Sequence, residues 1–328
     1  MGYKVYVTRR IPEPGLDRLR EECETVEVNP EDRCLTREEL LEKVRGRDGI
    51  LCLLTDTIDE AVLRAADRAR GFSNYAVGYN NIDVEKATEL GLIIANTPGV
   101  LTDATADMAW TLLMAAARRV VESDKVMRAG GYKGWAPMFM LGADVSGQTL
   151  GIVGAGRIGT EVALRARGFS MRILYCDPYP NETLDTKLRA RHVSLDALLA
   201  ESDFVSVHVP LQDDTRHLFG AEQFRRMKRT AIFINTSRGP VHDEAALVEA
   251  LRTGEIAAAG LDVYEDEPAM KPGLAELDNA VLCPHLGSAT VGARTRMALL
   301  AAENLLAIVK GERAPYCINC EVYDREPR

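Results

Sequence analysis

Three side chains suited to acid–base chemistry and anion binding follow consecutive apolar runs of the sequence. Arg238 follows the run 231–235, an acidic stretch begins at Asp262 after the run 256–261, and His285 follows the run 280–282. An arginine fork matches a carboxylate through two parallel hydrogen bonds. A neighbouring carboxylate favours the charged form of an imidazole, which then donates its proton to a carbonyl oxygen. The spacing therefore predicts a site that binds a small carboxylic acid and protonates its carbonyl group.

The carboxylate partner of His285 stays open at this level. Glu265, Asp266 and Glu267 all follow the same run, and spacing alone does not separate them. His208 precedes Val209-Pro210 at another strand end, where core packing and a place in a cofactor cleft are both compatible with the pattern. The remaining histidines fit the proton-donor role less well: His192, His217 and His242.

A phosphate-binding pattern lies upstream of these groups. A short apolar run, 149–153, leads directly into Gly154-Ala-Gly156-Arg157-Ile158-Gly159, a helix is expected over 160–167, and a second strand over 171–176 ends at Asp177. The first glycine suits a tight turn, the second leaves room for a pyrophosphate, and the third brings helix and strand close together. Free N–H groups at the start of the helix favour an anion. The order of these features predicts a dinucleotide site.

Charge selects the form of the dinucleotide. Asp177 would accept a hydrogen bond from a ribose 2′-hydroxyl and repel a 2′-phosphate, and residues 178–183 contain no Arg or Lys. We therefore predict NAD(H) rather than NADP(H).

The elements that must position these groups alternate between strands and helices, which is typical of an α/β protein with parallel sheets. We expect two doubly wound domains: a Rossmann-type NAD domain over 101–287, inserted into a flavodoxin-like substrate domain formed by 1–100 and 288–328. A long helix is expected over 102–128. The apolar, glycine-rich arm 130–147 is compatible with a satellite core, a subunit contact or a pocket wall.

Composition excludes several classes of function. The formal net charge is −9 and the pI is near 5.3, without a basic block, which argues against nucleic-acid and anionic-membrane partners. No signal-peptide pattern and no membrane-spanning run is present, so we expect a cytoplasmic protein. The seven cysteines are scattered, as in reduced proteins, and the single pair Cys317 and Cys320 lacks further ligands, so we expect no metal site.

Several motifs together carry a resemblance to a known family: 77–83 (Val-Gly-Tyr-Asn-Asn-Ile-Asp), 102–109, the glycine loop 154–159, 208–211 (His-Val-Pro-Leu), 234–239 (Ile-Asn-Thr-Ser-Arg-Gly), 260–264 with Glu267-Pro268, and 284–290. With them, the sequence resembles the D-2-hydroxyacid dehydrogenase family along nearly its whole length. Three further stretches, 73–79, Trp135-Ala-Pro-Met and Glu303-Asn-Leu, make it most similar to the glyoxylate and hydroxypyruvate reductases of that family.

The resemblance implies a role for individual residues. Arg238 would bind the substrate carboxylate, Glu267 would support His285 as the proton donor, and Asp262 would anchor the nicotinamide carboxamide. The substrate would also contact Leu54, Ala76, Val77 and Gly78, with Trp135 reaching into the neighbouring subunit of a homodimer. Arg238 and His285 are also expected to contact the cofactor, together with Val209, Pro210, Thr236, Ser237 and Gly287.

The resulting hypothesis is NADH-dependent reduction of a small 2-keto acid, glyoxylate or hydroxypyruvate, to the 2-hydroxy acid. A D-lactate-type or other D-2-hydroxyacid dehydrogenase remains an alternative, as does an NAD(H)-sensing binding protein of the same fold. Phosphoglycerate oxidation is disfavoured because residues 53–56 (Leu-Leu-Thr-Asp) offer no basic group to a phosphate.

Overall fold

The structure is a computed structural model that describes residues 2–324. The chain divides into two compact units, each of which is described by itself. Unit 1 contains the described residues up to Leu101 and from Ala289 onward, and unit 2 is Thr102–Ser288, so unit 2 is inserted between the two parts of unit 1 in sequence.

Unit 1 is built on a parallel sheet with the strand order β2-β1-β3-β4-β5. This is the order of flavodoxin-like doubly wound sheets. The central strands are short and buried, as parallel strands with helices on both faces must be. The strands are β1 (Tyr3–Val7), β2 (Cys23–Val28), β3 (Gly49–Cys52), β4 (Gly71–Asn74) and β5 (Ile93–Ala95).

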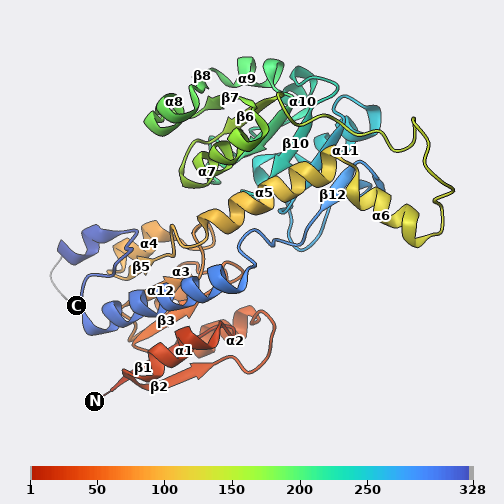
Figure 1. Ribbon diagram of the computed structural model, residues 1–328. Coiled ribbons are helices and arrows are strands. Elements are labelled where there is room, and N and C mark those ends of the chain that lie inside the picture. Colours follow the sequence, from red (N-terminus) through yellow and green to blue (C-terminus); the bar gives the residue numbers. More distant parts are fainter. Residues whose placement is uncertain (1, 325–328) are drawn as a thin grey trace. The chain divides into compact units, whose positions relative to one another are not determined.

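Helices cover this sheet, and the long C-terminal helix α12 packs on β3 and β4 (Figure 1). Thr290 caps its first turn, and Gly311 ends it in the left-handed conformation. Gly15 lets α1 lie against α12, because a Cβ there would meet Ala298 at 2.7 Å. The helices are α1 (Glu13–Arg20), α2 (Arg37–Lys43), α3 (Glu60–Ala65), α4 (Val84–Glu89) and α12 (Val291–Lys310), followed by the 3₁₀ turn η4 (Cys320–Asp324).

Unit 2 contains a second parallel sheet, with the order β12-β11-β10-β9-β6-β7-β8. The direction of winding reverses between β6 and β9, which is the topology of a Rossmann-type sheet and creates the switch point where such sheets bind ligands. The expected fold class is therefore confirmed. The strands are β6 (Thr149–Val153), β7 (Arg172–Cys176), β8 (Arg191–His192), β9 (Phe204–Val207), β10 (Ile232–Asn235), β11 (Ala258–Leu261) and β12 (Ala280–Leu282).

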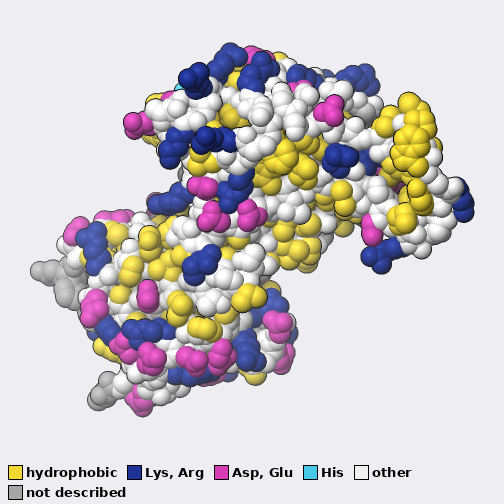
Figure 2. Space-filling view, viewed as in Figure 1, with side chains coloured by type: hydrophobic (Ala, Val, Ile, Leu, Met, Phe, Trp, Pro, Cys, Tyr) yellow, Lys and Arg dark blue, Asp and Glu magenta, His cyan; other side chains and the backbone are white. Residues whose placement is uncertain are grey.

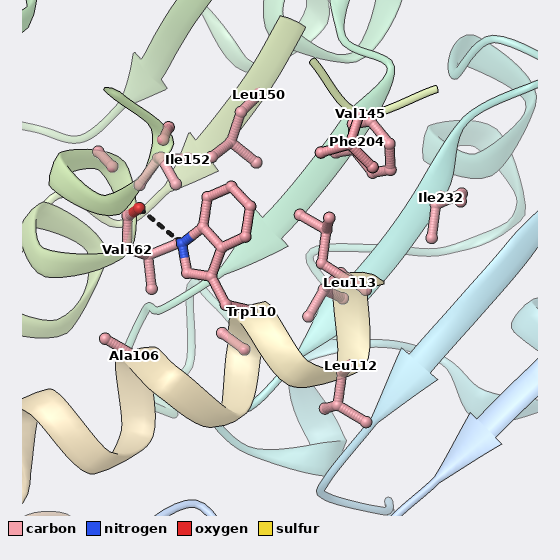
Figure 3. Packing of buried hydrophobic residues seen from close by; sticks show 14 of the residues in the cluster. Ala106, Trp110, Leu112, Leu113, Val145, Leu150, Ile152, Val162, Phe204 and Ile232 are labelled. Carbon is pink, nitrogen blue, oxygen red and sulfur yellow. Dashed lines mark hydrogen bonds between the residues drawn. The ribbon is translucent and has the colours of Figure 1, made fainter. Parts of the chain in front are cut away.

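Helix α5 forms much of the core on one face of this sheet (Figure 3). The buried Trp110 packs against Leu150 and Ile152 of β6 and donates its indole N–H to the carbonyl oxygen of Val162 at 2.9 Å, which ties α5 to α7. The helices of unit 2 are α5 (Thr102–Ala117), α6 (Val120–Arg128), α7 (Arg157–Arg165), α8 (Glu182–Leu188), α9 (Leu195–Glu201), α10 (Ala221–Arg226) and α11 (Glu244–Thr253), with 3₁₀ turns at Ala166–Phe169, Gly239–Val241 and Leu274–Glu276.

Two local expectations are corrected, and one stretch forms elements that the sequence did not suggest. The long helix predicted over 102–128 is two helices, because Arg119 adopts a left-handed φ of 52° and interrupts the helix between α5 and α6. Helix α7 begins at Arg157, inside the glycine motif, rather than at residue 160. Helix α8 and the short strand β8 form in a stretch for which no element was predicted, since Asn181 caps α8 through the N–H of Leu184.

Helix α6 and the arm after it carry an exposed apolar surface. Its most exposed large side chains are Val120, Met127, Trp135, Met138 and Leu141. We call these five residues the arm surface, and Figure 2 shows hydrophobic side chains gathered over this part of unit 2. A contiguous apolar patch of this kind marks an interaction site more often than a free surface.

Residues 2–324 include no helix that is both long enough and apolar enough to cross a membrane. The same residues place no three His, Cys, Asp or Glu side chains where they would hold a metal ion together.

Candidate active site

The glycine loop after β6 has a different steric constraint at each glycine. Gly154 has a φ of +92°, and a Cβ there would meet the backbone of His208 and Val209 at 2.8 Å. A Cβ on Gly159 would lie 2.0 Å from the carbonyl oxygen of Gly154, so this glycine permits the close packing of α7 on β6. A Cβ on Gly156 would meet nothing within 4 Å. The middle glycine therefore faces open space, which is where a pyrophosphate needs access to the backbone.

The N-terminus of α7 is suited to an anion. Gly156 is its N-cap and offers no side-chain cap, so the first N–H groups are not satisfied by a side chain. Arg157, the first residue of the helix, is exposed and forms no ion pair within the described chain, and the half-buried Ile158 follows it. These residues fit the phosphates of a dinucleotide.

Asp177 follows β7 and is held against the glycine loop. Its Oδ2 accepts the N–H of Ala155 at 2.8 Å, and its Oδ1 accepts the N–H of Tyr179 at 3.0 Å. A carboxylate has about four acceptor sites, so both oxygens can still accept a further hydrogen bond. The carboxylate thus lies beside the phosphate loop, at the end of the second strand, as a ribose-binding acid requires.

The turn after β10 presents Arg238 and is fixed by the buried Asn235. The Asn235 side chain accepts the N–H and hydroxyl of Ser237 and donates to the carbonyl oxygen of Arg238 and to Nδ1 of His242. Thr236 between them has a buried hydroxyl with no partner in the described chain, so a polar group of a bound cofactor would satisfy it. Gly239 allows this turn to approach the backbone of Tyr264, where a Cβ would clash.

The turn after β12 presents His285 and is fixed by Asp262. This buried carboxylate accepts the N–H of Leu286 and the N–H of Gly287, both at 2.6 Å. The His285 backbone has a φ of +56°, a left-handed conformation that non-glycine residues adopt mainly when their surroundings enforce it. The N–H of His285 also donates to the carbonyl oxygen of Asp262 at 3.0 Å. Asp262 therefore holds the histidine in place.

Of the three carboxylates that the sequence left open, Glu267 is the one in contact with His285. Its Oε2 lies 2.9 Å from His285 Nδ1, and its Oε1 accepts the N–H of Tyr264 at 3.0 Å. Glu265 instead pairs with His217 at 2.9 Å, and Asp266 pairs with Lys271. With Nδ1 facing Glu267, the Nε2 atom of His285 is the one available to a substrate.

Charge links the same three side chains. Burial opposes ionisation of Glu267, but the hydrogen bond and charge of His285, together with the charge of Arg238, hold the pKa of that carboxyl below its usual value. Burial lowers the pKa of the Arg238 guanidinium, and the negative charge of Glu267 opposes that shift. An arginine stays protonated throughout the physiological range in any case. Unit 2 thus brings together a guanidinium, a carboxylate and an imidazole at the carboxyl ends of β10, β11 and β12.

His208 is a structural neighbour of this cluster rather than a second acid. Burial lowers its pKa to about 3, and its Nε2 lies 2.8 Å from Ser206 Oγ. It therefore stays neutral at the end of β9, where it is followed by the half-buried Val209 and the exposed Pro210.

In unit 1 the loop after β4 is tied down through its carbonyl groups. The carbonyl oxygen of Ala76 accepts the N–H of Thr97 at 2.9 Å, that of Val77 accepts Asn96 Nδ2 at 2.7 Å, and that of Gly78 accepts Asn74 Nδ2 at 3.0 Å. The N–H groups of Val77 and Gly78 donate to no residue of the described chain. Successive free N–H groups on a fixed backbone suit an anion.

Leu54 lies on the neighbouring turn after β3. The buried Asp56 fixes this turn by accepting the N–H of Leu53 at 2.8 Å, and Asn81 donates to the carbonyl oxygens of Leu53 and Asp56. Unit 1 therefore brings Leu54 to the same edge of its sheet as Val77 and Gly78.

Trp135 is not brought to the cluster of unit 2 within a single chain. Its side chain is 83 % exposed on the arm, so it lines no part of the site around Arg238.

Two supporting residues escaped the sequence interpretation. The first is Asn235. An asparagine at a strand end, two residues before a serine, is typical of a turn in which the asparagine side chain accepts a hydrogen bond from the backbone two residues on, so the sequence could have indicated its role. The fully buried Glu244 accepts the N–H groups of Glu265 and Lys271 and so fixes the loop that carries Glu267. In sequence Glu244 is indistinguishable from an ordinary acidic residue in the first turn of a helix.

Comparison with known proteins gives a consistent result. Residues 110–287 match the family described as D-isomer specific 2-hydroxyacid dehydrogenase, NAD binding domain. A glyoxylate reductase of Korarchaeum cryptofilum is 52% identical over 329 residues, covering 100% of this chain and 99% of that protein.

Solved structures agree with this relationship. The TT0316 protein of Thermus thermophilus matches with a TM-score of 0.89 and 44% identity, over 96% of this chain and 99% of that one. An NADPH-dependent glyoxylate/hydroxypyruvate reductase of Sinorhizobium meliloti, in complex with NADP and malonate, matches with a TM-score of 0.86 and 31% identity over 100% of both chains. The chain belongs to the D-isomer specific 2-hydroxyacid dehydrogenase family and is an oxidoreductase with a nicotinamide cofactor.

Proposed function

We propose that this enzyme uses NADH to reduce a small 2-keto acid, glyoxylate or hydroxypyruvate, to the corresponding 2-hydroxy acid. The observation that carries the proposal is the cluster of Arg238, Glu267 and His285, in which Glu267 contacts His285 at 2.9 Å. The names of relatives that align over the full chain point to the same substrates. Unit 2 serves as the dinucleotide-binding domain and unit 1 as the substrate domain.

The cofactor is held by groups that the structure leaves open to it. Gly156 and the first N–H groups of α7 would hold the pyrophosphate together with Arg157, and Asp177 would accept from the adenosine ribose. Thr236 and Asp262 would hold the nicotinamide end together with Ser237, Val209, Pro210 and Gly287. When bound, the dinucleotide supplies the hydride that reduces the keto carbon.

The chain's own residues orient and protonate the substrate. Arg238 binds the carboxylate of the keto acid through its planar fork. Within unit 1, the N–H groups of Val77 and Gly78, with Leu54 and Ala76 beside them, are the groups that we propose for binding the keto acid. His285 donates a proton from Nε2 to the keto oxygen as negative charge develops there, and Glu267 stabilises the charged imidazole and fixes its orientation.

The preference for NADH rests on Asp177. Its carboxylate would repel the 2′-phosphate of NADPH, and residues 178–183 carry no basic side chain to compensate. The Sinorhizobium meliloti relative is described as NADPH-dependent, so both cofactors belong in the assay.

The test is the consumption of NADH and of NADPH with a panel of glyoxylate, hydroxypyruvate and pyruvate. We expect the highest kcat/KM with NADH and one of the first two acids. The Arg238→Ala variant should lose most of its affinity for the keto acid and most of its turnover while it still binds NADH. Turnover of pyruvate alone would favour a D-lactate-type enzyme. An absence of turnover with every small 2-keto acid, together with intact NADH binding, would favour an NAD(H)-sensing protein.

The arm surface supports a homodimer. The five side chains of the arm surface stay exposed in the single chain, and a second copy of the chain would cover them. In such a dimer Trp135 would contact the partner's substrate pocket and limit the size of the acid.

A further inference from the structure

Three residues far apart in the sequence form a closed ring of hydrogen bonds in unit 1. The N–H of Asn96 donates to the carbonyl oxygen of Tyr316 at 3.2 Å, and the N–H of Tyr316 donates to Asn304 Oδ1 at 3.1 Å. Asn304 Nδ2 closes the ring by donating to the carbonyl oxygen of Asn96 at 2.8 Å. Each member uses both a donor and an acceptor, so the ring fixes the backbone of Asn96 on both sides.

The ring determines where the Asn96 side chain lies. With its backbone held, Asn96 donates from Nδ2 to the carbonyl oxygen of Val77 at 2.7 Å. That peptide group belongs to the loop whose Val77 and Gly78 N–H groups remain free within the described chain. The carbonyl group of Val77 shares one peptide plane with the N–H of Gly78, so holding this carbonyl group limits where the Gly78 N–H can point. The N–H of Val77 lies in the preceding peptide, whose Ala76 carbonyl group accepts the N–H of Thr97 instead.

Asn304 is an unexpected residue at its position in the fold. It is completely buried on α12, among apolar neighbours such as Ala301 and Leu305, and the hydrogen bonds of the ring satisfy both ends of its amide. A buried amide is costly unless it is fully paired, and an apolar residue at this position would pack without that requirement. We therefore attribute the amide of Asn304 to its role in holding the backbone of Asn96 and Tyr316 in place.

We propose that Asn304 is a positioning residue for the keto acid, acting through Asn96 on the free N–H group of Gly78 in the Val77–Gly78 loop. This inference rests on the proposed function, because it assumes that the loop binds the substrate. Asn304 and the segment around Tyr316 come from the C-terminal part of the chain, so that part sets the affinity of a loop near residue 77.

The experiment is a double-mutant cycle with Asn96→Ala, Asn304→Ala and the combined variant, in the full-length protein. KM for the keto acid, kcat, the Kd for NADH and Tm are measured for each. Loss of one well-placed hydrogen bond corresponds to roughly a threefold to tenfold rise in KM. We expect each single variant to show such a rise, with kcat and the Kd for NADH nearly unchanged, because the dinucleotide binds to unit 2.

The decisive result is the combined variant. If Asn304 acts through Asn96, the double variant has the KM of the Asn96→Ala variant, since the second change has nothing left to disturb. If the rise in KM of the combined variant equalled the product of the rises in the two single variants, the proposal would be overturned. The matched control is Asn29→Ala, another buried asparagine of unit 1, which donates to the carbonyl oxygen of Arg33 and accepts the N–H of Glu31. It should lower Tm without changing KM, and an equal rise in KM would show that the effect is only structural.

Asn304→Asp is the second variant if Asn304→Ala does not fold. The aspartate still accepts the N–H of Tyr316 but cannot, when ionised, donate to Asn96, so KM should rise as for the alanine variant. An unchanged KM would contradict the proposal. The wild-type protein separates the two hypotheses: no turnover with any 2-keto acid defeats the proposed function, whereas turnover with unaffected KM values in the variants defeats only this inference.

Discussion

His285 Nδ1 lies 2.9 Å from Glu267 Oε2, and His217 Nε2 lies 2.9 Å from Glu265 Oε1 in the same unit. The two histidine–glutamate pairs thus have equal lengths, and their glutamates lie on one loop, two residues apart. Only the first is next to Arg238, whose charge acts on Glu267. The second pair is therefore an internal control for the chemistry of the first.

The Glu267→Gln substitution should slow the transfer of the proton from His285. Glu267 Oε2 lies 2.9 Å from His285 Nδ1, and its charge stabilises the charged imidazole and orients the ring. We therefore expect kcat to fall while NADH still binds. His285→Ala should reduce kcat by about 10²- to 10⁴-fold while NADH still binds. The control His217→Gln, which removes the partner of Glu265, should leave kcat in place, and an equal loss there would contradict the assignment.

Gly156 and Gly159 should separate cofactor binding from folding. A Cβ on Gly156 meets open space, so Gly156→Ala should fold normally and weaken NADH binding by intruding on the pyrophosphate. A Cβ on Gly159 would meet the carbonyl oxygen of Gly154 at 2.0 Å, so Gly159→Ala should lower the free energy of unfolding. Urea unfolding and NADH titration of both variants test this contrast. Equal loss of stability in the two variants would show that Gly156 is constrained by packing rather than by a ligand.

Much of the fold and of the candidate site could be predicted because both depend on local patterns. Short apolar runs, the glycine motif and Asp177 specify strand, turn, helix and strand in order, and the structure has them in that order. Arg238 and His285 were found because residues at the ends of neighbouring parallel strands share one edge of a sheet.

The remaining features depend on tertiary contacts that have no local signal. The break between α5 and α6 requires Arg119 to adopt a left-handed conformation, which an arginine in a sequence does not predict because glycine and asparagine are the residues that favour it. The choice of Glu267 over Glu265 and Asp266 depends on which carboxylate faces which base, and the roles of Glu244 and Asn304 depend on partners far away in the chain. Spacing could not supply this information.

Asp177→Ser should reduce the discrimination against NADPH. The substitution removes the negative charge that opposes the 2′-phosphate, so the ratio of kcat/KM for NADPH to that for NADH should rise by about tenfold or more. Because Asp177 also accepts the N–H groups of Ala155 and Tyr179, we expect weaker binding of NADH as well. Steady-state kinetics with both cofactors measure the ratio. If the ratio did not change, the carboxylate would not be at the ribose.

His242 should make the protein sensitive to acid. Burial lowers its pKa to about 4, against the opposing charges of Glu265 and Asp243, and its Nδ1 accepts a hydrogen bond from Asn235. The folded state therefore stays neutral at this residue while the unfolded chain binds a proton below about pH 6.5. The free energy of unfolding should fall as the pH drops from about 6.5 to 4, by up to about 1.4 kcal/mol per pH unit from this group.

The His242→Gln variant keeps an acceptor for Asn235 but does not titrate. Its stability should fall less steeply over that interval than the stability of the wild type, as measured by urea unfolding at several pH values. A slope unchanged by His242→Gln would show that the buried imidazole is not the group that titrates.

Disruption of the arm surface should dissociate the proposed homodimer. Met127→Asp and Met138→Asp each place a negative charge in the apolar arm surface. Forming the dimer would then bury an unpaired carboxylate, and the free-energy cost of removing that charge from water opposes association. Sedimentation velocity should show a dimer for the wild type and a shift to monomer for both variants. The matched control is Val291→Asp, because Val291 is 88 % exposed on α12 and lies outside the arm surface. A dimer that survives both arm variants, or one that is lost equally in the control, would place the interface elsewhere. If Trp135 lines the partner's pocket, the monomeric variants should also lose selectivity for short keto acids, which the substrate panel detects in the same preparations.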